Sequence, residues 1–127
     1  MSAFTERELA YLQGERRLAR LATVGADGTP HVAPVGWRIA DDGAIEVEGI
    51  SLDRTKKYRD IRATGRAAIV VDDVLPPWQP RGVEVRGRAE TLAAPRPLIR
   101  IHPERVVSWG IESQRMGDRH ARTVRGG

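Results

Sequence analysis

Two Asp-Gly pairs, at residues 27–28 and 42–43, constrain the fold of this chain more than any other feature of its sequence. Each pair separates short runs of apolar residues. An Asp-Gly pair between β-like runs favours a tight hairpin turn, because such a turn needs positive φ angles that glycine adopts at little cost. The pattern predicts three consecutive antiparallel strands, near residues 18–25, 30–39 and 44–51.

The pattern changes to helical spacing after residue 51. Tyr58 and Ile61 lie about one turn apart, Asp53 is a candidate N-cap, and Gly65 follows the last periodic residue. A helix is therefore expected between Asp53 and Gly65.

Three more strands are expected after this helix. Residues 66–73 contain a continuous apolar run, which predicts a strand buried on both faces. Alternation over residues 82–92 predicts a fifth strand with Gly87 as a possible bulge. Residues 98–111 predict a sixth strand, broken or shifted at its internal proline.

The two ends of the chain have different patterns. Thr5 and Glu8 have the spacing of a capping box, so a short amphipathic helix is expected before Gly14. Residues 117–127 have no apolar period, which predicts a basic, mobile tail that can be removed with little loss of stability. Residues 1–116 then form a single, mainly β domain, an antiparallel barrel with short flanking helices.

Composition excludes several classes of protein. The 127 residues include no cysteine, so disulfides and thiolate catalysis are excluded. No apolar run approaches the roughly 20 residues of a membrane span, and the N-terminus lacks a leader pattern, so no membrane partner and a cytoplasmic location are expected. Seven arginines against three acidic residues in positions 96–127 account for the net charge of +4. These charges are spread with little aromatic interleaving, so no nucleic-acid partner is expected.

Residues for unaided catalysis are missing. The chain has no glycine-rich phosphate loop and no dinucleotide fingerprint. Its three histidines fit no metal-ligand spacing, so no metal site is expected. If the protein is an enzyme, a cofactor must therefore supply the chemistry.

The only two lysines, Lys56 and Lys57, follow Thr55 at the start of the expected helix. A helix N-terminus offers unpaired N–H groups and a positive dipole end, so a hydroxyl and two ammonium groups there would form a phosphate site. The alternative is a solvated helix face.

The three tryptophans are the other candidate site residues. Trp78 lies in a proline-rich stretch, residues 74–82, that is expected to be a loop, and it is the best placed to cover a ligand or a partner subunit. Trp37 and Trp109 fit either the core or a pocket.

Four segments in this order resemble the flavin and deazaflavin split-barrel family that includes pyridoxamine 5'-phosphate oxidase. They are RLARLATVGADGTPHVAPV, TKKYRDIRATGRAAIVVDD, RGVEVRGRAETL and IRIHPERVVSWGI. Within the family, the chain is most similar to the branch of small oxidoreductases that use the deazaflavin coenzyme F-420. The resemblance implies a six-stranded antiparallel split β-barrel and a homodimer with cofactor sites at the interface.

The resemblance also implies roles for individual residues. The cofactor phosphate would be held by Thr55, Lys56 and Lys57, and Ile50 and Ser51 would lie beside the ring or the ribityl chain. On the second expected strand, Val32, Pro34, Val35 and Trp37 would line the cofactor ring. Together with Trp78 and Trp109, discussed above, they complete the set of candidate cofactor-binding residues. Gly82 stands where flavin-binding oxidases often have glutamine.

The function implied is reduction of a small unsaturated or carbonyl-type organic substrate by hydride transfer from reduced F-420. Arginines around residues 96–105 would suit the long anionic tail of this cofactor. An FMN-dependent oxidoreductase of the same fold and a non-catalytic flavin- or haem-binding protein are the alternatives.

Overall fold

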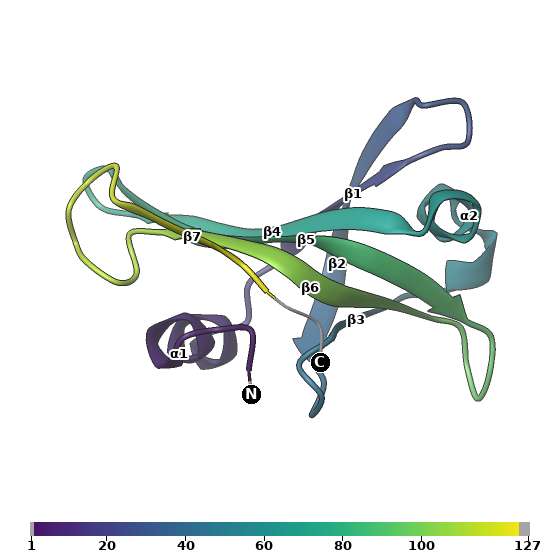
Figure 1. The fold of residues 1–127 in the computed structure, drawn as a ribbon, viewed down its shortest axis with the longest axis horizontal. Coiled ribbons are helices and arrows are strands. Elements are labelled where there is room, and N and C mark those ends of the chain that lie inside the picture. Colours follow the sequence, from purple (N-terminus) through teal and green to yellow (C-terminus); the bar gives the residue numbers. More distant parts are fainter. Residues whose placement is uncertain (1, 125–127) are drawn as a thin grey trace.

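The computed structural model describes residues 2–124, whose strands form a closed antiparallel barrel (Figure 1). Six strands follow one another around the barrel in the order β3-β2-β1-β4-β5-β6, and pairing of β3 with β6 closes it. A seventh strand, β7, pairs with β6 outside the closed ring. The strands are β1 Ala19–Val24, β2 Pro30–Ile39, β3 Ile45–Glu48, β4 Arg66–Leu75, β5 Gln79–Leu92, β6 Leu98–Trp109 and β7 Arg119–Thr123. The six-stranded antiparallel barrel is thus confirmed.

Both Asp-Gly turns form the predicted hairpins. Gly28 has φ 86° and Gly43 has φ 90°, the left-handed region that favours glycine. The Asp27 carboxylate accepts a hydrogen bond from the Thr29 N–H at 2.9 Å and so closes its own turn. These local contacts explain why the first three strands could be predicted from the sequence.

The turn between β4 and β5 is shorter than the sequence predicts. Residues 74–82 were expected to be a loop, but β4 continues to Leu75 and β5 begins at Gln79. The two strands stay paired because Asp73 lies opposite Arg81 and forms an ion pair with it, with Arg81 Nε 2.8 Å from Asp73 Oδ1.

Gly87 lies at the predicted bulge between β5 and β6. Arg86 pairs with Arg105, whereas Gly87 pairs with Pro103, so the register shifts by one residue. A Cβ atom at Gly87 would lie 2.0 Å from the carbonyl oxygen of His102, so only glycine fits this close approach.

Two helices flank the barrel, on opposite sides in Figure 1. Helix α1, Glu6–Gly14, begins with the predicted capping box. Helix α2, Lys56–Thr64, is capped by Thr55 and not by Asp53, because Asp53 belongs to the short 3₁₀ helix η1, Leu52–Arg54.

Within the predicted tail, Arg119–Thr123 form a strand, β7, which the lack of an apolar period did not predict. Arg122 Nη1 lies 3.1 Å from Glu8 Oε2, and Ser108 donates a hydrogen bond to the same carboxylate oxygen at 2.6 Å. Glu8 is fully buried. Burial alone would raise the pKa of Glu8, but hydrogen bonds from Arg122, Ser108 and Thr5 outweigh it and lower that pKa. The segment therefore anchors α1 to the barrel.

The core fills the inside of the barrel, and its largest fully buried side chains include Leu21, Ile45, Ile69, Ile99 and Ile101. Strand β4 is buried on one face only, since Ala68 and Val70 point outward and stay partly exposed. The prediction of burial on both faces is therefore wrong. Within residues 2–124, no helix has the length and apolar character needed to cross a bilayer.

Candidate functional site

Thr55 holds the N-terminus of α2 with its hydroxyl group. Thr55 Oγ1 donates to the Leu52 carbonyl at 2.6 Å and accepts from the Tyr58 N–H at 3.4 Å. Both bonds are local to this turn. The Thr55 hydroxyl therefore fixes the backbone of the candidate phosphate site.

The two lysines have different surroundings. Lys56 Nζ lies 2.9 Å from Asp60 Oδ1, and this hydrogen bond is the largest cause that lowers the pKa of Asp60. Asp60 is buried and also accepts a hydrogen bond from Thr23 at 2.8 Å. Within residues 2–124, the half-exposed Lys57 forms no ion pair. Lys57 is therefore the lysine that is free to bind an anion.

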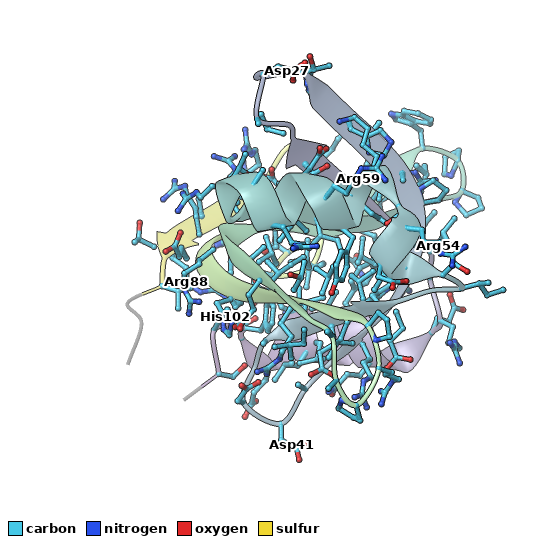
Figure 2. The ribbon with its side chains drawn as sticks, turned by 90° about the vertical axis from the view of Figure 1, so that its right-hand side faces the viewer. Asp27, Asp41, Arg54, Arg59, Arg88 and His102 are labelled. Carbon is cyan, nitrogen blue, oxygen red and sulfur yellow. The ribbon has the colours of Figure 1, made fainter. Side chains whose placement is uncertain are left out.

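The segment that leads into α2 and the start of this helix carry exposed arginines and one exposed apolar side chain. Arg54 and Arg59 are exposed near the start of α2 (Figure 2), where Arg59 Nη1 donates to the Arg54 carbonyl at 2.9 Å. Ile50 is 98% exposed, and Ser51 adopts a left-handed conformation with φ 51°. An anionic ligand with an apolar body fits this combination.

The candidate residues of β2 lie on two different faces. Val32, which is 65% exposed, and Pro34 point out of the barrel, on the strand that starts near α2. Val35 is buried in the core, and Trp37 points to the same inner side. Only Val32 and Pro34 can therefore share one outer surface with the start of α2.

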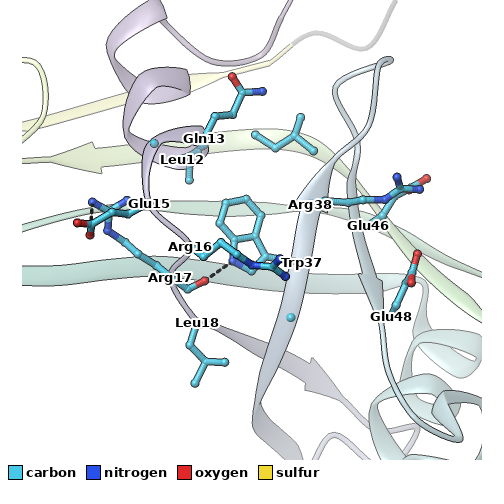
Figure 3. Close-up of a pocket in the computed structure, with 13 residues that line it drawn as sticks. Leu12, Gln13, Glu15, Arg16, Arg17, Leu18, Trp37, Arg38, Glu46 and Glu48 are labelled. Carbon is cyan, nitrogen blue, oxygen red and sulfur yellow. Dashed lines mark hydrogen bonds and ion pairs between the residues drawn. The ribbon is translucent and has the colours of Figure 1, made fainter.

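Trp37 forms a wall of a cleft with a volume of about 870 Å³ (Figure 3). Its Nε1 donates to the Arg17 carbonyl at 2.7 Å, which fixes the indole ring between β2 and the segment after α1. The lining residues include Gln13, Arg16, Leu18, Gly36, Trp37, Arg38 and Glu46.

Trp78 and Trp109 lie away from this cleft. Trp78 is 65% exposed at the turn between β4 and β5. Trp109 packs over Gly82 of the neighbouring strand, where an added Cβ atom would lie 2.6 Å from the indole ring and 2.7 Å from the Asp72 side chain. Gly82 therefore leaves room for Trp109, and a glutamine has no space at this position.

Sequence reasoning missed a cluster around Tyr11. The Tyr11 hydroxyl donates to Asp73 Oδ1 at 2.9 Å, and the Arg17 guanidinium lies 3.9 Å above the Tyr11 ring. Burial, followed by the bond to Asp73, raises the pKa of Tyr11. The only other tyrosine, Tyr58, is buried and donates to the Leu92 carbonyl at 3.1 Å.

We expect the ionised Asp73 carboxylate to make the free energy of unfolding depend on pH. Hydrogen bonds from Arg81 are the largest cause that lowers the pKa of Asp73, to about 2 from 3.8. Its folded pKa is depressed, so its contribution of about 2 kcal/mol is present above pH 4 and is lost as pH falls towards 2. Asp73→Asn should lower the free energy of unfolding at pH 7 and flatten its pH dependence in that range. Urea unfolding at several pH values tests this, and an unchanged slope would contradict it.

The arginines expected to attract an anionic cofactor tail are engaged elsewhere. Arg96 is paired with Glu48, and Arg100 Nη2 lies 2.5 Å from Asp42 Oδ2. Arg105 donates to the Thr123 hydroxyl at 3.2 Å. The charge around residues 96–105 is therefore not free to favour the long anionic tail of F-420.

The closed six-stranded antiparallel barrel with its two flanking helices defines a split-barrel protein. The chain belongs to the pyridoxamine 5'-phosphate oxidase family, which it matches over residues 4–125. It is 41% identical, over 95% of its length and 93% of the relative's, to the 5a,11a-dehydrotetracycline/5a,11a-dehydrooxytetracycline reductase of Streptomyces rimosus subsp. rimosus.

Solved structures share the fold at lower identity. A conserved hypothetical protein of Mycobacterium tuberculosis has a TM-score of 0.71 and 24% identity, with 85% of this chain and 86% of that chain covered. A FAD-binding protein of Mesorhizobium loti has a TM-score of 0.63 and 22% identity, with 83% and 93% covered. At these identities, both structures show a shared fold only.

Proposed function

We propose that this protein is an oxidoreductase that reduces an unsaturated or carbonyl-type organic substrate with the reduced deazaflavin coenzyme F-420. The observation that carries the proposal is the 41% identity, over almost the whole of both chains, to a reductase of dehydrotetracyclines. The four segments that resemble the small F-420 branch support the same choice of cofactor.

The residues present fit such a cofactor. Lys57 and the N–H groups of the first turn of α2 would hold its phosphate, with Ser51 and Ile50 beside them. The outer surface of Val32 and Pro34 would support the apolar part. Lys56 stays paired with Asp60 and acts by fixing the turn.

When bound, reduced F-420 supplies a hydride, and a proton from water completes the reduction of a double bond. Neither tyrosine is suited to give this proton. Tyr11 donates to Asp73 and has a raised pKa, and Tyr58 donates to a backbone carbonyl. The protein's part is to bind and orient the two reactants.

The packing at Gly82 favours a deazaflavin over FMN. In flavin-binding oxidases of this kind, a glutamine often occupies the corresponding position, and here Trp109 fills that space. A polar contact to the flavin ring is thereby lost, which lowers the expected affinity for FMN.

Equilibrium titration of the purified protein tests the choice of cofactor. F-420, FMN, FAD and haem are added separately, and binding is followed by fluorescence or absorbance. We expect F-420 to bind at least tenfold more tightly than the others. Tighter binding of FMN, FAD or haem would overturn the assignment in favour of that cofactor.

A homodimer is the second part of the proposal. The outer face of β1 and β2 exposes Val32 at 65% and Val24 at 42%, and Ala22, which pairs with Val32, is exposed on the same face. A contiguous apolar face of this kind marks an interaction site, and a twofold dimer is the commonest closed assembly. The partner would then cover the surface proposed for the cofactor.

We expect Val32→Asp to convert the dimer to a monomer, because it places a charge in the centre of this face. Ala93→Asp adds the same charge on the exposed turn between β5 and β6 and should leave the dimer intact. Light scattering at micromolar concentration measures both. A monomeric parent, or a dimeric Val32→Asp variant, would contradict the proposed interface.

A further inference from the structure

The cleft beside Trp37 and the phosphate site near Lys57 lie at opposite ends of β2. Thr23, which bonds to Asp60 of α2, pairs with His31, and Trp37 follows six residues later. At about 3.3 Å per residue, these two levels are roughly 20 Å apart along the strand. The cleft is therefore clear of the phosphate site. Its lining includes Gly36, which follows Pro34 on the outer side of β2, so the ring of a cofactor extended along Val32 and Pro34 would meet an acceptor at the edge of the cleft.

Trp37 offers a rigid aromatic surface in this cleft. Its indole N–H is held by the Arg17 carbonyl at 2.7 Å. The side chain of Arg17 is only 10% exposed and donates to the Tyr11 carbonyl at 2.6 Å, so the group that holds Trp37 is itself fixed. A ring locked in this way loses little conformational entropy when a planar ligand stacks on it.

The charges around the cleft balance. Its charged lining residues are three basic and three acidic side chains: Arg16, Arg17, Arg38, Glu15, Glu46 and Glu48. A polyanion gains nothing from such a lining, whereas hydroxyl, carbonyl and amide groups find both donors and acceptors. Leu12, Leu18 and Ile39 add apolar surface beside Trp37.

We propose that this cleft binds the organic acceptor, and that the acceptor is a planar molecule of several fused rings with hydroxyl and carbonyl groups at its edges and no large net charge. The proposal rests on the proposed reductase function and assigns its substrate site. The volume of about 870 Å³ lies in the range of small-molecule sites. Trp37 then belongs to the acceptor site and not to the cofactor site.

Gly36 allows the cleft to be blocked without disturbing the fold. It lines the cleft, and a Cβ atom added there meets no other atom within 4 Å. We expect Gly36→Leu to lower the affinity for tetracycline, used as a fused-ring probe, by at least tenfold, whereas Gly36→Ala should stay within threefold of the parent. Isothermal titration calorimetry without cofactor measures both.

Trp37→Leu and Trp37→Phe test the stacking surface. The leucine variant should bind tetracycline at least tenfold more weakly, and the phenylalanine variant should keep most of the affinity. Lys57→Ala should leave tetracycline affinity unchanged and weaken F-420 binding. Circular dichroism identifies any variant that fails to fold. If a Trp37 variant does not fold, the comparison of Gly36→Leu with Gly36→Ala tests the site.

Two results would overturn this assignment. One is a parent protein that binds F-420 but no tetracycline, which rejects the fused-ring class and leaves the proposed reductase intact. The other is tetracycline binding that neither Gly36→Leu nor Trp37→Leu changes, which places the acceptor elsewhere. Failure of F-420 to bind the parent would instead count against the proposed function.

Discussion

Deletion of residues 117–127 is expected to destabilise the protein strongly, because it removes β7 and with it Arg122. The fully buried Glu8 would then lose the cation that neutralises it. Removing one partner of a buried ion pair costs about 3–5 kcal/mol, which for a domain of this size lowers Tm by roughly 10 °C or more. Thermal unfolding followed by circular dichroism measures the loss.

Single substitutions separate the ion pair from the strand. Arg122→Ala should cost most of the stability lost on deletion, whereas Arg119→Ala, on the same strand but exposed, should change the free energy of unfolding by less than about 0.5 kcal/mol. Replacing Glu8 and Arg122 together by Met should recover part of the loss. If the deleted protein unfolds at the parent's temperature, β7 does not anchor α1.

Lys57→Ala is expected to weaken F-420 binding by roughly 10- to 150-fold, the equivalent of one charge-assisted hydrogen bond of about 1.5–3 kcal/mol. Affinity of the parent should fall with added salt, and the variant should depend on salt less steeply. Fluorescence titration at two salt concentrations measures both effects.

Lys56→Ala is the matched comparison on the same turn. Because Lys56 is paired with the buried Asp60, this change should mainly lower the unfolding temperature, and the loss of cofactor affinity should be smaller than for Lys57→Ala. If the parent and Lys57→Ala bind every cofactor tested with equal affinity, Lys57 does not bind the cofactor and is an ordinary solvent-exposed charge.

Features set by neighbouring residues were predictable from the sequence. The Asp27 turn, the Thr5 capping box and the Gly87 bulge each depend on contacts within a few residues or on one glycine. The different surroundings of the two lysines also left a signal, because Lys56 and Asp60 have the i, i+4 spacing of a helical ion pair. That spacing pairs Lys56 with Asp60 and leaves Lys57 as the lysine available to an anion.

Features set by distant residues were not predictable in this way. Glu8 and Arg122 are 114 positions apart, so no local pattern marks β7 as a strand. The Trp37 cleft exists because the segment after α1 packs against β2, and the space over Gly82 is decided by Trp109 on a neighbouring strand. Such contacts follow from the closure of the barrel.

The most direct measurement of the central claim is turnover. The purified protein is mixed with reduced F-420 and 5a,11a-dehydrotetracycline, and oxidation of the cofactor is followed by its absorbance together with the mass of the product. We predict that one equivalent of cofactor is oxidised for each acceptor that gains two hydrogens. Reduction of the acceptor with reduced FMN but not with reduced F-420, or no reduction with either by a protein that binds both ligands, would contradict the account.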